Sequence, residues 1–148
     1  MIDVMKLTMP FLVEGLWMTF KISLITIFCG SALGFVVGML RTVGGWAVSS
    51  TLGIYIHTLR GTPFLIHLYV IYFILPETGI SWLQLEAFPA AVIALSLYTS
   101  TYVAEIVRSA VEAVPNGQGE AARSAGMTAW QSMRHVILPQ ALKMMIPP

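Results

Sequence analysis

The chain has 148 residues, of which 57% are hydrophobic and only 10% are charged, with a formal net charge of +1. This composition is too apolar for a soluble domain of this length, so we predict an all-α membrane protein with a single transmembrane domain over residues 1–148. The small net charge excludes a nucleic-acid-binding protein, and one cysteine cannot form a disulfide or a thiolate metal site within the chain. We predict no metal site.

The first predicted transmembrane helix covers about residues 18–41. No charged residue lies between Lys21 and Arg41, and nineteen helical residues rise about 28 Å, close to the thickness of the hydrocarbon core. Glycines recur at every fourth position of this segment: Gly30, Gly34 and Gly38. They share one helix face, where another backbone can approach closely. We expect this face to pack inside the chain's own bundle; the alternative is a dedicated dimer contact.

The second predicted span covers about residues 57–76. The connection before it is polar at its start, which favours an interfacial turn leading into a helix. Pro63 has no amide hydrogen and disfavours α geometry at the preceding residue. A helix junction is therefore predicted over four residues: Arg60, Gly61, Thr62 and Pro63. The apolar run 64–75 rises only about 18 Å. To span, it must recruit the turns upstream of Arg60 or start with Pro63 near the membrane surface.

The third predicted span covers about residues 86–107, bracketed by Glu86 and Glu105. Its second half is rich in hydroxyl groups, which need partners or water inside a bilayer. Hydrogen bonding between helices is the plainer explanation, and the alternative is a substrate path. The candidate path residues are Ser96, Tyr98, Thr99 and Ser100, together with His67 in the second span.

The distribution of arginines predicts the orientation. Arginines lie in the connections 41–60 and 105–138, whereas residues 76–86 contain no Lys or Arg. By the positive-inside rule, the two arginine-bearing connections are cytoplasmic and the N-terminus is outside.

The predicted cytoplasmic loop, about residues 108–138, contains signals for two short helices. Asn116-Gly117 is typical of a turn or cap, Glu120 is expected in the first turn, and Gly126 is expected to end the first helix in the left-handed conformation. Thr128 and Gln131 have the spacing of a capping box. The second helix is expected to end before Leu138-Pro139. Residues 139–148 are then expected to begin a fourth span, with the chain a fragment, a truncated product or a subunit completed by partners.

Several segments resemble a known family. Glu120-Ala121-Ala122, Gly126 and Val136-Ile137-Leu138-Pro139 are spaced as in the EAA loop of ABC-importer permeases. The polar amino-acid uptake branch of that family, of the histidine/glutamine/arginine type, is similar at four further segments: Arg60 to Pro63, Tyr102 to Arg108, Val114 to Gln118 and Leu138 to Ala141.

This resemblance implies a type I ABC-importer permease fold, with three transmembrane helices, a cytoplasmic helix-turn-helix elbow and the start of a fourth span. The implied partners are ABC ATPase subunits, a second permease copy or paralogue, an extracytoplasmic amino-acid-binding protein, membrane lipid and a polar amino acid. The implied location is the bacterial cytoplasmic (inner) membrane, with several passes. The residues implied to contact the ATPase are Glu120, Ala121, Ala122, Arg123, Gly126 and Met127.

The resemblance also implies a transporter subunit without enzymatic activity. The chain contains no G-x-x-x-x-G-K-[ST] loop, so we expect no cofactor on this chain, with ATP and Mg on the partner ATPase. A secondary transporter is a competing hypothesis, but it predicts ionisable residues inside the spans, and none lies between Lys21 and Arg41 or between Glu86 and Glu105. A truncated, nonfunctional or structural membrane subunit is the other alternative.

Overall fold

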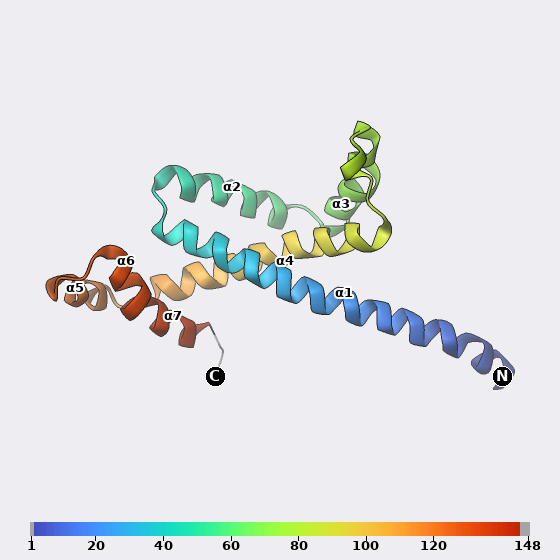
Figure 1. Ribbon diagram of the computed structural model, residues 1–148, viewed down its shortest axis with the longest axis horizontal. Helices are drawn as coiled ribbons and strands as arrows, with labels where there is room; N and C mark the ends of the chain where they lie inside the picture. The colour runs from blue at the N-terminus through green and yellow to red at the C-terminus, as the bar shows by residue number, and fades with distance from the viewer. Residues whose placement is uncertain (1, 146–148) are drawn as a thin grey trace.

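Two long helices form the centre of the protein. The computed structural model describes the backbone of residues 2–145 and the side chains of residues 8–145, and among these residues there are only helices and turns. α1 (Ile2–Val43) and α4 (Ala87–Glu112) run in the same direction and pack side by side over most of their shared length (Figure 1). We call the end where both helices terminate the Arg41 end, and the end where α4 begins the Glu86 end.

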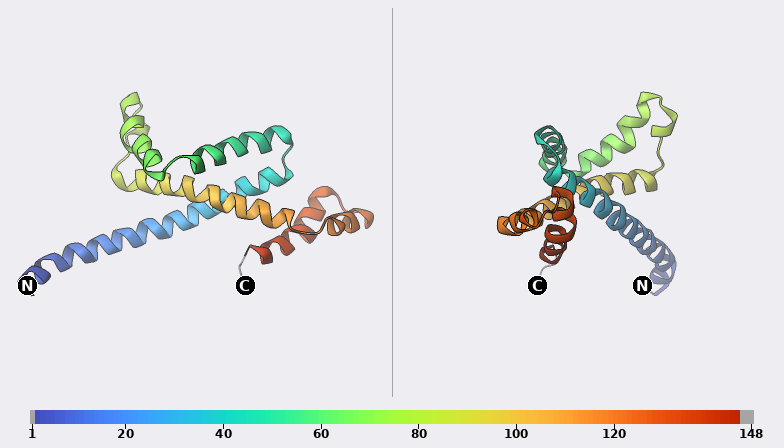
Figure 2. Two further views of the ribbon diagram at one scale, coloured as in Figure 1. Left: turned by 180° about the vertical axis from the view of Figure 1, so that it is seen from behind. Right: turned by 60° about the vertical axis from the view of Figure 1, so that its left-hand side comes forward.

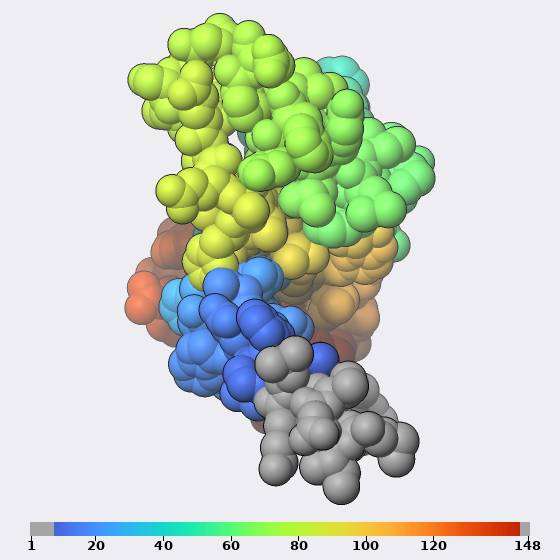
Figure 3. Space-filling model, turned by 90° about the vertical axis from the view of Figure 1, so that its right-hand side faces the viewer, coloured from blue at the N-terminus to red at the C-terminus, as the bar shows by residue number. Residues whose placement is uncertain are grey.

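The remaining elements lie around this pair. α2 (Trp46–Gly61) returns alongside it, and a short α3 (Phe64–Tyr69) continues through a π-helical turn (Val70–Ile74) and two 3₁₀ turns (Leu75–Thr78 and Ser81–Leu83). Seen from the Glu86 end, this segment rises to one side while α1 lies on the other (Figure 3). At the Arg41 end lie α5 (Asn116–Ser124), α6 (Ala129–Ser132), a second π-helical turn (Met133–Ile137) and α7 (Leu138–Met144) (Figure 2).

Two helices are long and apolar enough to cross a bilayer, Thr8–Val43 and Ala87–Glu112 among the described residues. The predicted span 18–41 lies within α1, but the helix begins already at Ile2 and continues through Pro10. A single proline removes one hydrogen bond and does not end a helix whose other turns are intact, which is common in transmembrane helices.

The three glycines of α1 face α4, as predicted for packing within one bundle. A Cβ atom on Gly30 would lie 2.8 Å from the Cβ of Thr99, and one on Gly38 would lie 2.7 Å from the carbonyl oxygen of Ala104. Contacts this short are possible only for glycine, so these positions let the two backbones approach directly.

The predicted turn that leads into a helix lies at Gly44-Gly45, and α2 is helical from Trp46 onward, so the polar residues after the turn are already part of the helix. The hydroxyl of Thr51 donates to the carbonyl oxygen of Ala47 at 2.9 Å, which satisfies it within the helix. Ile56 is 1% exposed and packs with Val37 and Ala104. α2 therefore lies along the helix pair, and only the beginning of the connection 41–60 is at the Arg41 end.

The predicted helix junction is confirmed at Thr62-Pro63, and it bends the chain within the predicted second span. Thr62 is extended, with φ −119° and ψ 147°, and the segments on either side meet at 103°. The predicted span 57–76 is therefore broken rather than straight, because Pro63 supplies no amide donor and excludes α geometry at Thr62.

Each π-helical turn comes directly before a Leu-Pro pair. The Leu75 amide donates to the carbonyl oxygen of Val70, and the Leu138 amide donates to that of Met133. A wider turn accommodates the proline ring, which would otherwise clash with the carbonyl group four residues earlier. The second elbow helix therefore does not end before Leu138-Pro139 as predicted, but continues to Met144. Of the predicted fourth span, residues 146–148 lie outside the described residues.

Candidate functional site

The first helix of the elbow begins one residue earlier than the cap signal suggests. Pro115 is the N-cap residue, with φ −56° and ψ 133°, and Asn116 is already helical. Glu120 is consequently the fifth residue of α5 and lies outside the first turn, which corrects the sequence prediction. The cause is Pro115, whose fixed φ angle sets the start of the helix upstream of Asn116.

α5 ends as predicted. Gly126 has a φ angle of +83°, and its amide donates to the carbonyl oxygen of Arg123 at 2.9 Å. The next amide, of Met127, reaches back to the carbonyl oxygen of Ala122 at 3.1 Å. These bonds satisfy carbonyl groups of the last turn and fix a sharp reversal that favours glycine.

The second helix also begins as predicted. The Gln131 amide donates to the hydroxyl oxygen of Thr128 at 3.2 Å, while the Thr128 amide donates to the side-chain oxygen of Gln131 at 2.8 Å. This reciprocal capping box satisfies the first turn of α6. Met127 is therefore the linker residue between the left-handed Gly126 that follows α5 and the N-cap of α6 at Thr128.

The six predicted coupling residues divide by exposure. Glu120, Ala121, Arg123 and Gly126 are exposed, Met127 is half-buried and Ala122 is buried. Glu120 and Arg123 border a small groove of about 210 Å³ between α5 and the end of α4. The exposed residues are free to meet a partner, while Ala122 holds the elbow together.

The elbow is packed directly onto the long helices. Ala141 of α7 is fully buried against Ala110 and Val111 of α4 and against Val114 in the turn that follows. Met39 of α1 packs on the same cluster. Within the elbow, a side-chain methyl group of Ile137 lies 3.6 Å from the Cβ position of Gly119. A displacement of α5 would therefore be transmitted through close contacts to α4 and α1.

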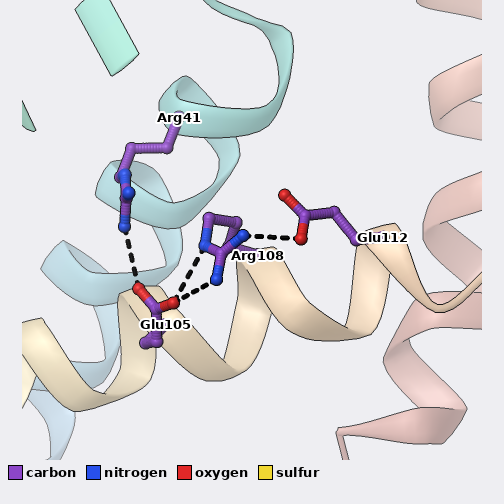
Figure 4. Close-up of polar contacts among 4 residues, drawn as sticks. All are labelled: Arg41, Glu105, Arg108 and Glu112. Atoms are coloured by element: carbon purple, nitrogen blue, oxygen red, sulfur yellow. Dashed lines mark hydrogen bonds and ion pairs between the residues drawn. The ribbon is translucent and has the colours of Figure 1, made fainter. Parts of the chain in front are cut away.

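A chain of charged residues joins the long helices at the same end (Figure 4). Arg41 of α1 donates to Glu105 of α4 at 2.8 Å, and Arg108 donates to the other oxygen of Glu105 through Nε at 2.9 Å. Arg108 also donates to Glu112 at 2.5 Å. Sequence reasoning missed this network, although the i, i+3 and i, i+4 spacing from Glu105 to Glu112 is a signal for its α4 part.

The predicted substrate-path residues on α4 face in different directions. The hydroxyls of Ser100 and Tyr55 are 2.7 Å apart, and Ser100 also donates to the carbonyl oxygen of Leu97 at 2.7 Å. Thr99 packs beneath Gly30 of α1, and Ser96 is buried. These three hydroxyl residues lie in the contacts between helices.

Tyr98 lies on another side of α4, next to the helix junction. Its ring centroid is 6.0 Å from that of His67, whose Nε2 atom is 2.7 Å from the Thr62 hydroxyl. The Tyr98 and Tyr102 hydroxyls are 3.0 Å apart, and the guanidinium of Arg60 lies over the Tyr102 ring at 4.8 Å. The structure thus brings the junction together with Tyr98 and His67. Gly61 and Pro63, the other junction residues, are exposed.

Comparison with known proteins identifies relatives of the whole arrangement. The family described as "Binding-protein-dependent transport system inner membrane component" matches residues 30–148. The chain is 38% identical over 139 residues to the glutamine transport system permease protein GlnP of Escherichia coli K12, covering 94% of this chain and 63% of that protein. It is 36% identical over 138 residues to the arginine transport system permease protein ArtQ of Bacillus subtilis, covering 93% of this chain and 62% of that protein. The chain thus spans slightly less than two thirds of these relatives.

Two solved structures are also similar. A crystal structure of an amino acid ABC transporter with histidines matches with a TM-score of 0.83 and 38% identity, over 97% of this chain and 65% of that one. An inward-facing structure of the MetNI methionine ABC transporter matches with a TM-score of 0.73 and 28% identity, over 93% of this chain and 66% of that one.

Proposed function

Because the chain belongs to the family of binding-protein-dependent transport system inner membrane components, we propose that it acts as the permease subunit of an ATP-driven importer of polar amino acids. It is an integral membrane protein with the fold of ABC-importer permeases. Support for a polar amino acid as substrate comes from relatives named as glutamine, cystine and arginine transport system permeases.

The observation that carries this proposal is the elbow. Its exposed residues are Glu120, Ala121, Arg123 and Gly126, which lie along α5 and at the reversal that follows it. α5 packs on the π-helical turn Met133–Ile137, which continues into α7 and packs onto α4 and α1. An ATPase subunit that binds this surface and moves on binding and hydrolysing ATP would move the ends of both long helices. ATP and Mg would be held by that ATPase, outside this chain.

The remaining partners follow from the same proposal. A second permease copy or a paralogue would complete the transport path, and an extracytoplasmic binding protein would deliver the amino acid. The elbow lies on the arginine-bearing side, so we propose that it faces the cytoplasm and that the N-terminus lies outside, in the bacterial inner membrane.

The test replaces Gly126 by two residues of nearly equal size. Asn and Asp both tolerate a positive φ angle better than other non-glycine residues, so Gly126→Asn and Gly126→Asp differ mainly in charge. We expect the Asp variant to lower ATP-dependent uptake of radiolabelled L-glutamine, L-arginine or L-cystine by about tenfold or more, and the Asn variant to retain most of it. ATP hydrolysis should continue, uncoupled from uptake.

Membrane levels of both variants are measured by immunoblot, so that loss of protein is separated from loss of coupling. Normal uptake by a fully inserted Gly126→Asp variant would refute the coupling role of the elbow. Failure of the unaltered chain to support uptake of any polar amino acid, with its ATPase and binding protein present, would refute the proposed function itself.

A further inference from the structure

Arg60 places a positive charge beside α4, a helix long and apolar enough to cross a bilayer. Its guanidinium lies 4.8 Å from the centroid of the Tyr102 ring. Tyr102 lies within about 4 Å of the midpoint of α4 along the helix axis, at 1.5 Å per residue. Ionisable residues beside a membrane-spanning helix are uncommon, and they typically mark substrate or ion paths.

No carboxylate in the described part of the chain neutralises this charge. The ion pairs there join Arg41 and Arg108 to Glu105, and Arg108 to Glu112. Glu105 borders the same cavity as Arg60, but both of its oxygens are already used by Arg41 and Arg108. The Tyr102 ring compensates the guanidinium only in part, and it leaves the N–H donors of Arg60 available.

The guanidinium faces a cavity of suitable size. A space of about 430 Å³ is lined by Arg60, Tyr102, Ile106, Ser109 and Met144. Tyr102, Ile106 and Ser109 lie on the face of α4 turned away from the buried Ala104 and Val107 that pack on α1. The cavity therefore offers one unpaired cation, the hydroxyl groups of Tyr102 and Ser109, and apolar walls, while the Glu105 carboxylate at its edge is engaged by Arg41 and Arg108. This combination suits a small ligand with one anionic group.

We propose that Arg60 binds the α-carboxylate of the transported amino acid in this cavity, an assignment that rests on the proposed function. The planar guanidinium can donate two parallel hydrogen bonds to a carboxylate, which a lysine cannot reproduce. Tyr102 acts as a positioning residue, because its ring holds the guanidinium at the cavity wall.

The first test measures uptake kinetics in the assembled transporter. Arg60→Gln should raise KM for the imported amino acid about ten- to hundredfold, because a charge-assisted hydrogen-bonded contact is lost. Arg60→Lys should lie between Arg60→Gln and the unaltered chain. Tyr102→Phe keeps the ring face and should change KM little, whereas Tyr102→Leu removes the face and should raise KM.

The second test does not depend on transport. The unaltered 148-residue chain in lipid nanodiscs is treated with phenylglyoxal, and modification of Arg60 is followed by mass spectrometry. Millimolar L-glutamine, L-arginine or L-cystine should slow the modification, whereas the corresponding amino-acid amides, which lack the carboxylate, should not. Arg134, which is exposed on the elbow, provides the internal control and should be modified at the same rate in all samples.

The outcomes separate the two proposals. Normal uptake by Arg60→Gln with unchanged KM would overturn the carboxylate site and leave the importer function intact. Equal slowing by amino acids and their amides, or no slowing by either, would overturn it as well. Slowing by amino acids alone in a chain that never supports uptake would support the site and refute the importer function.

Discussion

Single residues decide how closely the two long helices approach. The spacing of Gly30, Gly34 and Gly38 predicts a face for close packing, and the structure shows that α4 occupies it. The sequence favours packing inside the bundle but does not identify the partner helix, because a glycine face lets any helix backbone approach. The nearest atoms at Gly34 and Gly38 include backbone carbonyl oxygens of α4, which cannot move aside as a flexible side chain can.

Gly34→Ala is therefore expected to destabilise the protein. The new Cβ would lie 2.6 Å from the carbonyl oxygen of Ser100, so the helices must separate, at a cost of about 1–3 kcal/mol. Gly15→Ala, in the same helix with nothing within 4 Å, should be neutral or gain up to about 1 kcal/mol from helix propensity. Thermal unfolding in detergent measures both, and equal stabilities of the two variants would contradict this explanation.

At the scale of elements, local signals predict helix ends better than they predict helix continuity. The left-handed Gly126 and the capping box of Thr128 and Gln131 are confirmed, because each depends on atoms within a few residues. The continuation of the second elbow helix through Pro139 was missed, because it depends on a π-helical turn and on the packing of Ala141 against α4.

The charge network that joins α1 to α4 gives a prediction at this scale. Arg41 and Glu105 have side chains that are 13% and 29% exposed, so water screens their attraction only in part. A double-mutant cycle with Arg41→Met and Glu105→Gln should give a coupling energy of about 1–2 kcal/mol in the free energy of unfolding.

The control cycle uses Arg108→Met and Glu112→Gln on a single helix. Glu112 is 58% exposed, so its coupling to Arg108 should stay below about 0.5 kcal/mol. If the coupling energy of Arg108 and Glu112 is as large as that of Arg41 and Glu105, the ion pair between helices contributes no more to stability than one within a single helix.

For the whole molecule, the arginine distribution predicts an orientation. The sequence counts Arg60 among the arginines of the connection 41–60, but the structure places it away from the Arg41 end. Arg41, Arg108 and Arg123 lie toward the end that carries the elbow, but Arg60 lies beside Tyr102, about halfway along α4. The positive-inside argument retains its direction without Arg60, since residues 76–86 still contain no Lys or Arg.

Cysteine labelling tests this orientation. In a Cys29→Ser background, Ser81→Cys lies in the turn region near the Glu86 end and Ser124→Cys lies in α5, and both positions are exposed. A membrane-impermeant maleimide added to spheroplasts, whose outer membrane has been removed, should label Ser81→Cys directly and Ser124→Cys only after the inner membrane is permeabilised. The reverse pattern would place the elbow outside the cell and contradict the coupling proposal.

The sequence by itself determined the features that depend on composition and near neighbours. These are the membrane location, the helix junction at Pro63, the left-handed Gly126 and capping box of the elbow, and the glycine face of α1. Only the tertiary structure decided which helix covers that face, that Arg41 pairs with Glu105, and that Arg60 stands unpaired over Tyr102 beside a cavity. Such contacts join residues more than forty positions apart, and the packing of α1 and of α2 against α4 that creates them is not set by any local signal.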